Sequence, residues 1–176
     1  MTTAWRALKG AENARRMGAD RIEEPKDALG GRPVSKSEVS DPHILHPGEI
    51  ELFDRGTGVK TIPLVGKWNT VGNKVTTGMT VFAPGTQIPL HTHNVEETVM
   101  VLEGEATAVV GENRFDLVAE DVTWVPSGVP HCFINRGAGQ MRIYWVYGGR
   151  DVTRTICATG ETFEHLSERD RGATKA

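Results

Sequence analysis

From about residue 48 onward, apolar and polar residues alternate in short runs separated by turn signals. β-branched and aromatic residues fill these runs, and glycine or proline pairs such as Pro84-Gly85 and Ser127-Gly128 separate them. Strands spaced in this way are typical of all-β sandwiches and barrels. No helical pattern lies between the runs, which excludes an alternating βαβ fold and favours antiparallel pairing. We predict strands near residues 49–54, 59–65, 76–83, 88–93, 96–103, 105–110, 113–118, 121–125, 130–135, 140–147 and 152–157.

The two ends of the chain differ in composition from this central part. Residues 1–45 are rich in charge, glycine and proline, and Trp5–Met17 has the pattern of a short helix interrupted by Gly10. This N-terminal arm is either a disordered leader or a segment that packs on the domain or on a second subunit. Residues 159–176 predict a polar C-terminal tail. One domain, over residues 46–158, therefore accounts for the predicted core.

Charge and cysteine content narrow the class of protein. Lys and Arg number 20 and Asp and Glu 23, for a net charge of −3, so no basic excess exists to bind a nucleic-acid backbone. No apolar run approaches the ~20 residues of a membrane helix, and the N-terminus lacks the apolar segment of a signal peptide. The two cysteines are too few for a disulfide framework. We expect a reduced, cytoplasmic protein that binds neither nucleic acid nor membrane.

Two segments concentrate residues that bind metal ions. His91 and His93 are two residues apart, so both side chains leave the same face of a strand, and Glu97 follows after a tight turn. The second segment, Pro126–His131, is a proline- and glycine-fixed turn that leads into a strand. Only six histidines exist in the chain, and three of them lie in these segments. Three imidazoles and one carboxylate are ligands that suit transition metals.

The spacing of these residues resembles the two motifs of the cupin family. The first motif, G-x5-H-x-H-x3-E-x6-G, is matched at every fixed position by Gly85, His91, His93, Glu97 and Gly104. The second, G-x5-P-x-G-x2-H-x3-N, is matched by Pro126, Gly128, His131 and Asn135. Its first position departs from the pattern, because Glu120 stands where the family has glycine. A glycine there serves a turn with positive φ, so Glu120 implies a different or strained turn.

The resemblance implies an all-β fold, a single antiparallel cupin barrel of the jelly-roll type. It also implies one divalent transition metal, with Fe²⁺ favoured and Mn²⁺, Zn²⁺ or Ni²⁺ as alternatives. The ligands carried over from the family are His91, His93, Glu97 and His131.

Residues that share parity with the ligands should surround this site. Val99, Val101 and Phe133 are expected to line an apolar interior. In the strand 141–147, Arg142 and Tyr144 lie on one face, and Ile143, Trp145 and Tyr147 on the other. The strand pattern does not show which face points inward. If it is the first, Arg142 is a candidate to pair a substrate carboxylate and Tyr144 to donate a proton, with Arg154 a further candidate.

Three functions fit these features. The leading one is a non-haem Fe(II) dioxygenase that acts on a small oxo-acid or an aromatic substrate. The second is redox-neutral isomerase, lyase or decarboxylase chemistry on the same site, and the third is a cupin that binds a small molecule without turnover. We also expect a homodimer, since pairing of barrels covers exposed strand edges, with the arm and the tail as interface elements.

Overall fold

The structure, a computed structural model, describes residues 41–42 and 44–171, so most of the predicted N-terminal arm lies outside the described residues. Twelve strands and two short 3₁₀ helices make up this part of the chain. In chain order the elements are η1 (Pro47–Glu49), β1 (Phe53–Gly56), β2 (Val59–Val65), β3 (Thr76–Phe82), β4 (His91–His93), β5 (Glu97–Glu103), β6 (Ala106–Val110), β7 (Asn113–Leu117), β8 (Val122–Val125), β9 (His131–Asn135), β10 (Met141–Tyr147), β11 (Thr153–Ile156), β12 (Thr162–Glu164) and η2 (Glu168–Arg171).

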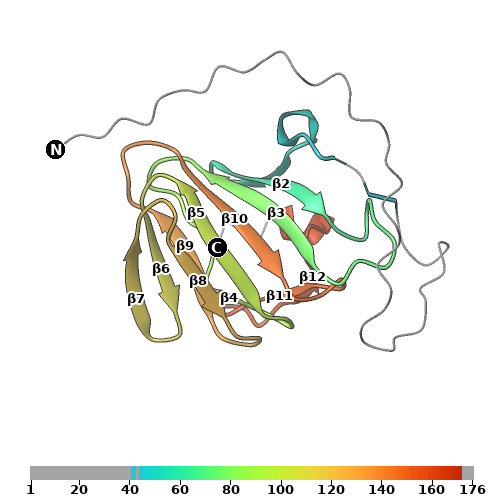
Figure 1. Cartoon of the computed structure of the whole chain (residues 1–176). Helices are drawn as coiled ribbons and strands as arrows, with labels where there is room; N and C mark the ends of the chain where they lie inside the picture. The colour runs from blue at the N-terminus through green and yellow to red at the C-terminus, as the bar shows by residue number, and fades with distance from the viewer. Residues whose placement is uncertain (1–40, 43, 172–176) are drawn as a thin grey trace, which may run out of the picture. The chain divides into compact units, whose positions relative to one another are not determined.

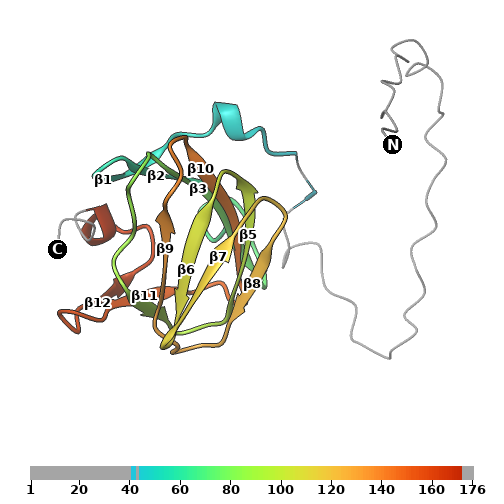
Figure 2. The same ribbon diagram turned by 90° about the vertical axis from the view of Figure 1, so that its left-hand side faces the viewer.

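The strands form two six-stranded sheets packed face to face (Figures 1 and 2). One sheet has the order β1-β2-β3-β10-β5-β8, the other β12-β11-β4-β9-β6-β7. Neighbouring strands in both sheets are antiparallel. The prediction of an all-β jelly-roll barrel is confirmed.

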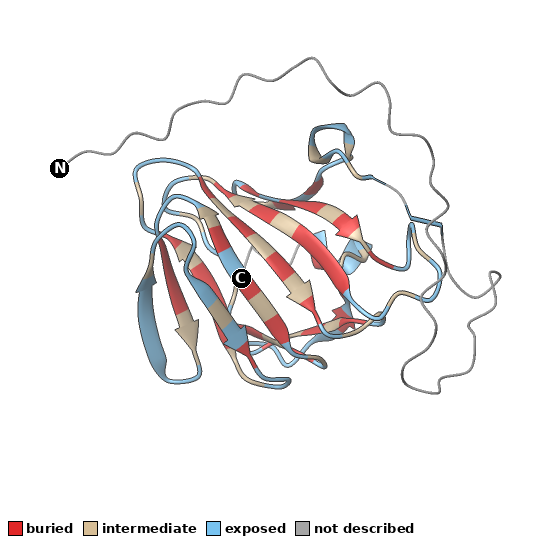
Figure 3. Ribbon diagram, in the orientation of Figure 1, coloured by how far each residue is buried: buried red, intermediate tan, exposed pale blue. Residues whose placement is uncertain are grey.

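Alternating burial along the strands explains the packing of the two sheets (Figure 3). Along β10, every second residue is buried from Met141 to Tyr147. Val99, Val101 and Phe133 are each 1% exposed and belong to the central apolar cluster, as predicted. Side chains two residues apart leave the same face of a strand, so one face of each inner strand supplies the core.

The C-terminal segment takes part in the fold. Within the predicted tail, β12 pairs with β11 and η2 follows it (Figure 2). Phe163, His165 and Asp170 are buried there. The polar composition of this segment conceals the few side chains that point inward.

Tight turns place the two motif segments, and glycines make three of these turns. Gly85, Gly104 and Gly128 have φ angles of 72°, 84° and 77°, in the left-handed region that glycine tolerates. At Gly104 a Cβ atom would lie 2.7 Å from the carbonyl oxygen of Gln140, so the close approach also excludes a side chain. Glu120 has φ 79°, so the turn keeps its glycine-like conformation with a glutamate in it.

Within the described part of the chain, no helix has the length and apolar character needed to cross a membrane.

Candidate metal centre

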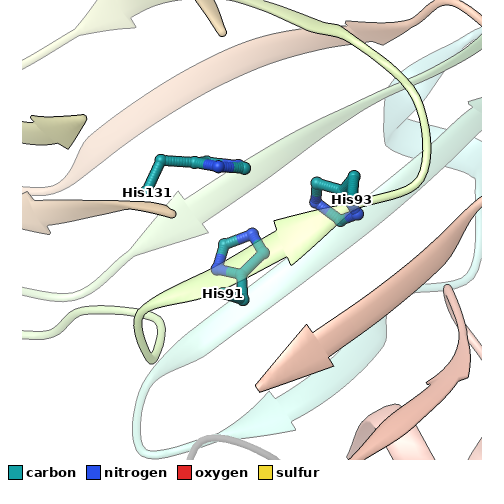
Figure 4. Close-up of side chains that lie close together, drawn as sticks. All are labelled: His91, His93 and His131. Carbon is teal, nitrogen blue, oxygen red and sulfur yellow. The ribbon is translucent and has the colours of Figure 1, made fainter. Parts of the chain in front are cut away.

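Three buried histidines from two neighbouring strands gather at one point (Figure 4). His91 and His93 come from β4, and His131 opens β9, where it is paired with His91 across the two strands. One ligand nitrogen from each ring lies within 4.8 Å of the others. Each of the three side chains is at most 3% exposed. The parity of β4 and its register with β9 therefore create a compact imidazole cluster inside the barrel.

The backbone fixes the orientation of all three rings. The Nδ1 atom of His91 lies 2.7 Å from the carbonyl oxygen of Pro89. The Nδ1 atoms of His93 and His131 each lie 2.8 Å from a carbonyl oxygen, that of Thr153 for His93 and that of Val129 for His131. A carbonyl oxygen only accepts, so each Nδ1 carries the proton. In a neutral ring Nε2 then carries the acceptor lone pair, which is the arrangement found in metal-binding histidines.

Glu97 faces this cluster from the opposite sheet. Its Oε2 lies 2.8 Å from Nε2 of His131, and neither atom has a hydrogen-bond donor among the described residues. With Nδ1 protonated, Nε2 is an acceptor, and the carboxylate is also an acceptor. Two buried acceptors at this distance repel unless a proton or a metal ion lies between them. The side chains present therefore fit a cation at this position.

Burial and charge keep these groups in the forms that bind metals. Burial, reinforced by the charge of Arg154, lowers the pKa of His91 well below 6.5 and that of His93 to about 3, so both rings are neutral near pH 7. Burial by itself raises the pKa of Glu97, yet its net pKa is lowered, so the carboxylate is ionised near pH 7. Neutral imidazole and ionised carboxylate are the states that bind metal ions.

Strand β10 brings a different tyrosine to the site from the one we named. The hydroxyl of Tyr147 donates to Nε2 of His93 at 3.1 Å, and Tyr147 is paired with Glu97 in the strand register. Tyr144 and Arg142 lie on the opposite face of β10, so their candidate catalytic roles are not supported. Arg142 is 42% exposed and lies 3.4 Å from Glu103. The buried face of β10 is the one that carries Ile143, Trp145 and Tyr147.

Asn135, the last fixed position of the second motif, stabilises a loop. Its side-chain nitrogen lies within 3.1 Å of the carbonyl oxygens of Phe82, Ala83 and Gly139. Its side-chain oxygen accepts from the backbone N–H of Gly137. These bonds hold the loop after β9 in place.

The sequence motifs missed a second group of buried polar residues. Arg55, His165 and Asp170 join Arg154 beside the histidine cluster, and each is at most 6% exposed. They come from β1, the segment after β12, η2 and β11, which are far apart in the chain. Of these four residues, only Arg154 could have been placed from the local sequence, because the alternation along β11 assigns it to the inward-facing side of the strand.

The sequence matches a family model and a curated relative. Residues 78–147, which include all four candidate ligands and most of the core strands around them, match the family model described as "Cupin domain". A curated relative, quercetin 2,3-dioxygenase of Bacillus subtilis (strain 168), is 24% identical over 125 residues. The match covers 70% of this chain and 36% of that protein, so the chain spans about a third of its curated relative.

Solved structures share the fold. An RmlC-like cupin from Shewanella frigidimarina NCIMB 400 has a TM-score of 0.54 at 21% identity, with 64% of this chain and 94% of that chain covered. A sugar phosphate isomerase from Silicibacter pomeroyi DSS-3 has a TM-score of 0.56 at 18% identity, with 70% of this chain and 93% of that chain covered. A predicted oxalate decarboxylase from Thermotoga maritima has a TM-score of 0.54 at 24% identity, with 61% of this chain and 99% of that chain covered.

Proposed function

We propose that this chain, in which residues 78–147 match the family model described as "Cupin domain", is a metal-dependent enzyme whose single divalent ion is held by His91, His93, Glu97 and His131. The observation that carries the proposal is the pair of buried acceptors, His131 Nε2 and Glu97 Oε2, 2.8 Å apart without a donor among the described residues. A cation removes their repulsion, and the other two imidazoles present their own Nε2 atoms beside it.

When bound, such an ion supplies Lewis-acid chemistry and, if it is iron, redox chemistry with oxygen. The side chains around the ion control the access of water and supply a proton donor. Val99, Val101 and Phe133 form an apolar wall that limits the access of water. The Tyr147 hydroxyl, which donates a hydrogen bond to His93, is the proton donor that we assign to the substrate. Burial, with the Glu97 charge next, raises the pKa of Tyr147 well above 10, so its proton is retained near pH 7.

We further propose that the reaction is an Fe²⁺-dependent dioxygenation of a small oxo-acid or an aromatic compound. The likeness to quercetin 2,3-dioxygenase supports this choice over redox-neutral chemistry. In this proposal the apolar wall holds the carbon skeleton, and Tyr147 hydrogen-bonds to a substrate oxygen.

Elemental analysis of anaerobically purified protein tests the site. We expect about one equivalent of iron per chain, lost from the double variant His91→Ala/His131→Ala, which removes two of the proposed ligands. His46→Ala is the matched control, because His46 is exposed before η1, and its metal content should equal that of the wild type.

Each result has a distinct meaning. Iron in the wild type, together with O2 uptake on oxo-acid or aromatic substrates, supports the dioxygenase. Zinc, nickel or manganese at the same level favours the redox-neutral alternative, in which the ion acts only as a Lewis acid. A folded wild type that takes up none of these metals contradicts the site assignment and leaves a binding protein without turnover.

A further inference from the structure

A network of buried charges lies beside the three histidines. Asp170 accepts from Arg154 Nη1 at 2.9 Å through Oδ1, and its Oδ2 lies 2.8 Å from Arg55 Nη1. The backbone N–H of Leu166 donates to the same Oδ2 at 2.8 Å. All three charged side chains are at most 2% exposed. Asp170 therefore holds two guanidinium groups in place from η2.

Two members of this region have donors or acceptors that nothing in the described chain satisfies. Arg154 Nε has no hydrogen-bond partner among the described residues, and neither ring nitrogen of His165 has one. The nearest carboxylate oxygen to His165 Nδ1 is Oδ2 of Asp170 at 3.7 Å, beyond hydrogen-bond length. Buried polar groups in folded proteins are nearly always paired, so these three nitrogens indicate a missing polar ligand.

These nitrogens border the candidate metal centre. Arg154 is paired with His93 across β4 and β11, which puts both side chains on the same face of that sheet. The His165 ring centroid lies 5.8 Å from that of His93 and 5.0 Å from that of Tyr147. A molecule that reached the metal and the Tyr147 hydroxyl would therefore also reach this wall.

The charge balance selects the kind of molecule. Four charged side chains are buried in the described structure: two cations, Arg55 and Arg154, and two anions, Glu97 and Asp170. A divalent ion would leave two positive charges uncompensated in a low-dielectric interior, which is costly unless an anion enters with it.

We propose that Arg154 and His165 form an anion subsite that binds the carboxylate of a small substrate, such as a 2-oxo acid, beside the metal centre. This inference rests on the proposed function for the position of the metal, but the subsite itself is made of protein groups. Arg154 supplies the charge and Nε–H, His165 supplies a ring N–H, and Asp170 positions Arg154. Guanidinium groups suit carboxylates because their N–H groups match carboxylate geometry.

Calorimetric titration of the full chain, metal-free and loaded with Co²⁺, tests the subsite. The probes are pyruvate and its neutral amide, pyruvamide. We expect wild-type protein to bind pyruvate at least ~10-fold more tightly than pyruvamide, because the charged carboxylate makes charge-assisted hydrogen bonds that the neutral amide cannot make. Arg154→Gln should reduce this ratio to about one. Arg142→Gln, which removes an arginine from the outward face of β10, is the matched control and should leave the ratio unchanged.

A second variant covers the risk that Arg154→Gln does not fold after losing its bond to Asp170. His165→Phe keeps the ring volume and removes both nitrogens, so it should weaken pyruvate binding while Co²⁺ content stays at the wild-type level. Circular dichroism checks the fold of each variant.

The outcomes separate this inference from the proposed function. Pyruvate preference that depends on Arg154 in metal-free protein supports the subsite even if no metal binds, in which case the proposed function fails by itself. Equal binding of pyruvate and pyruvamide by the wild type overturns the subsite. Unchanged preference in folded Arg154→Gln or unchanged affinity in His165→Phe also overturns it, whatever the metal content.

Discussion

At position 120 a glutamate adopts a backbone conformation that favours glycine. Its φ of 79° lies in the left-handed region, where a Cβ atom crowds the following carbonyl. The backbone N–H of Glu120 donates to the carbonyl oxygen of Val101 at 2.8 Å, so pairing with the neighbouring strand holds the turn in this conformation. The departure from the cupin motif thus changes the residue and preserves the turn.

Glu120→Gly should stabilise the protein by about 0.5–1 kcal/mol. Removing the left-handed strain gains about 1–2 kcal/mol, and the extra freedom of glycine in the unfolded chain offsets part of it. Urea denaturation measures the change as a higher midpoint with an unchanged slope. Glu112→Gly is the control, since Glu112 lies in an exposed turn without positive φ and should lose stability. A lower midpoint for Glu120→Gly would contradict the strain argument.

At the scale of elements, the pairing of β3 with β10 decides which side chains reach the interior. Trp145 of β10 packs over Gly78 of β3, and its Nε1 donates to Thr80 Oγ1 at 3.0 Å. This packing buries the face of β10 that ends at Tyr147. The absence of a side chain at Gly78 therefore leaves room for the Trp145 ring against β3.

Gly78→Ala should destabilise the protein by about 1–3 kcal/mol, the usual cost of overpacking. The new Cβ would meet the Trp145 ring and would lie 2.7 Å from the carbonyl oxygen of Ile62, which is backbone and cannot rotate away. Thermal unfolding checks this, with Gly139→Ala as the control because no atom lies within 4 Å of a Cβ there. Equal melting temperatures for the two variants would contradict the prediction and show that β3 and β10 move apart to accommodate the Cβ at little cost in free energy.

At the scale of the whole molecule, the C-terminal segment ties distant parts of the barrel together. Asp170 of η2 bonds to Arg55 of β1 and Arg154 of β11, one strand from each sheet. Burial raises the pKa of Asp170, but the two arginines outweigh it and hold the pKa below 3.8. The carboxylate is therefore charged at neutral pH and bridges the two sheets.

Asp170→Asn should cost about 3–5 kcal/mol at pH 7, because it leaves two buried guanidinium groups without their counterion. Asp151→Asn, at a carboxylate that is 79% exposed and lies 3.4 Å from Lys67, should cost under about 1 kcal/mol. Urea denaturation at pH 7 compares the two. Similar losses in both variants would mean that the buried network contributes little.

The same carboxylate predicts a pH dependence. A lowered folded pKa means that the unfolded chain takes up the proton first, so the stabilisation is complete above about 3.8 and is lost as pH falls through the lower folded value. Wild-type stability should therefore fall more steeply than that of Asp170→Asn below that pH. Parallel curves for the two proteins would contradict this assignment.

An apolar edge surface, made of Phe115, Val118, Val122 and Trp124 next to β7 and β8, is 48–60% exposed. Edge strands with exposed apolar side chains favour pairing with another chain, so we propose that this surface forms the predicted homodimer. Light scattering should give twice the mass of one chain for the wild type and a single chain for Trp124→Lys. Leu52→Lys, on the segment before β1, should stay dimeric. A wild-type protein with the mass of a single chain would contradict the proposed dimer.

The strand pattern, the turns and the spacing of His91, His93, Glu97 and His131 could be predicted from the order of residues, because each depends on contacts within a few residues. The remaining features depend on packing between segments far apart in the chain. The inward face of β10 depends on which sheet it packs against, since alternation is symmetric and Tyr144 and Tyr147 fit it equally well. The buried network of Arg55, Arg154, His165 and Asp170 depends on pairing between strands far apart in the chain. The sequence pattern of a polar tail does not reveal such pairing. Asp170 is buried because it forms ion pairs with Arg55 and Arg154, which lie far from it in the chain.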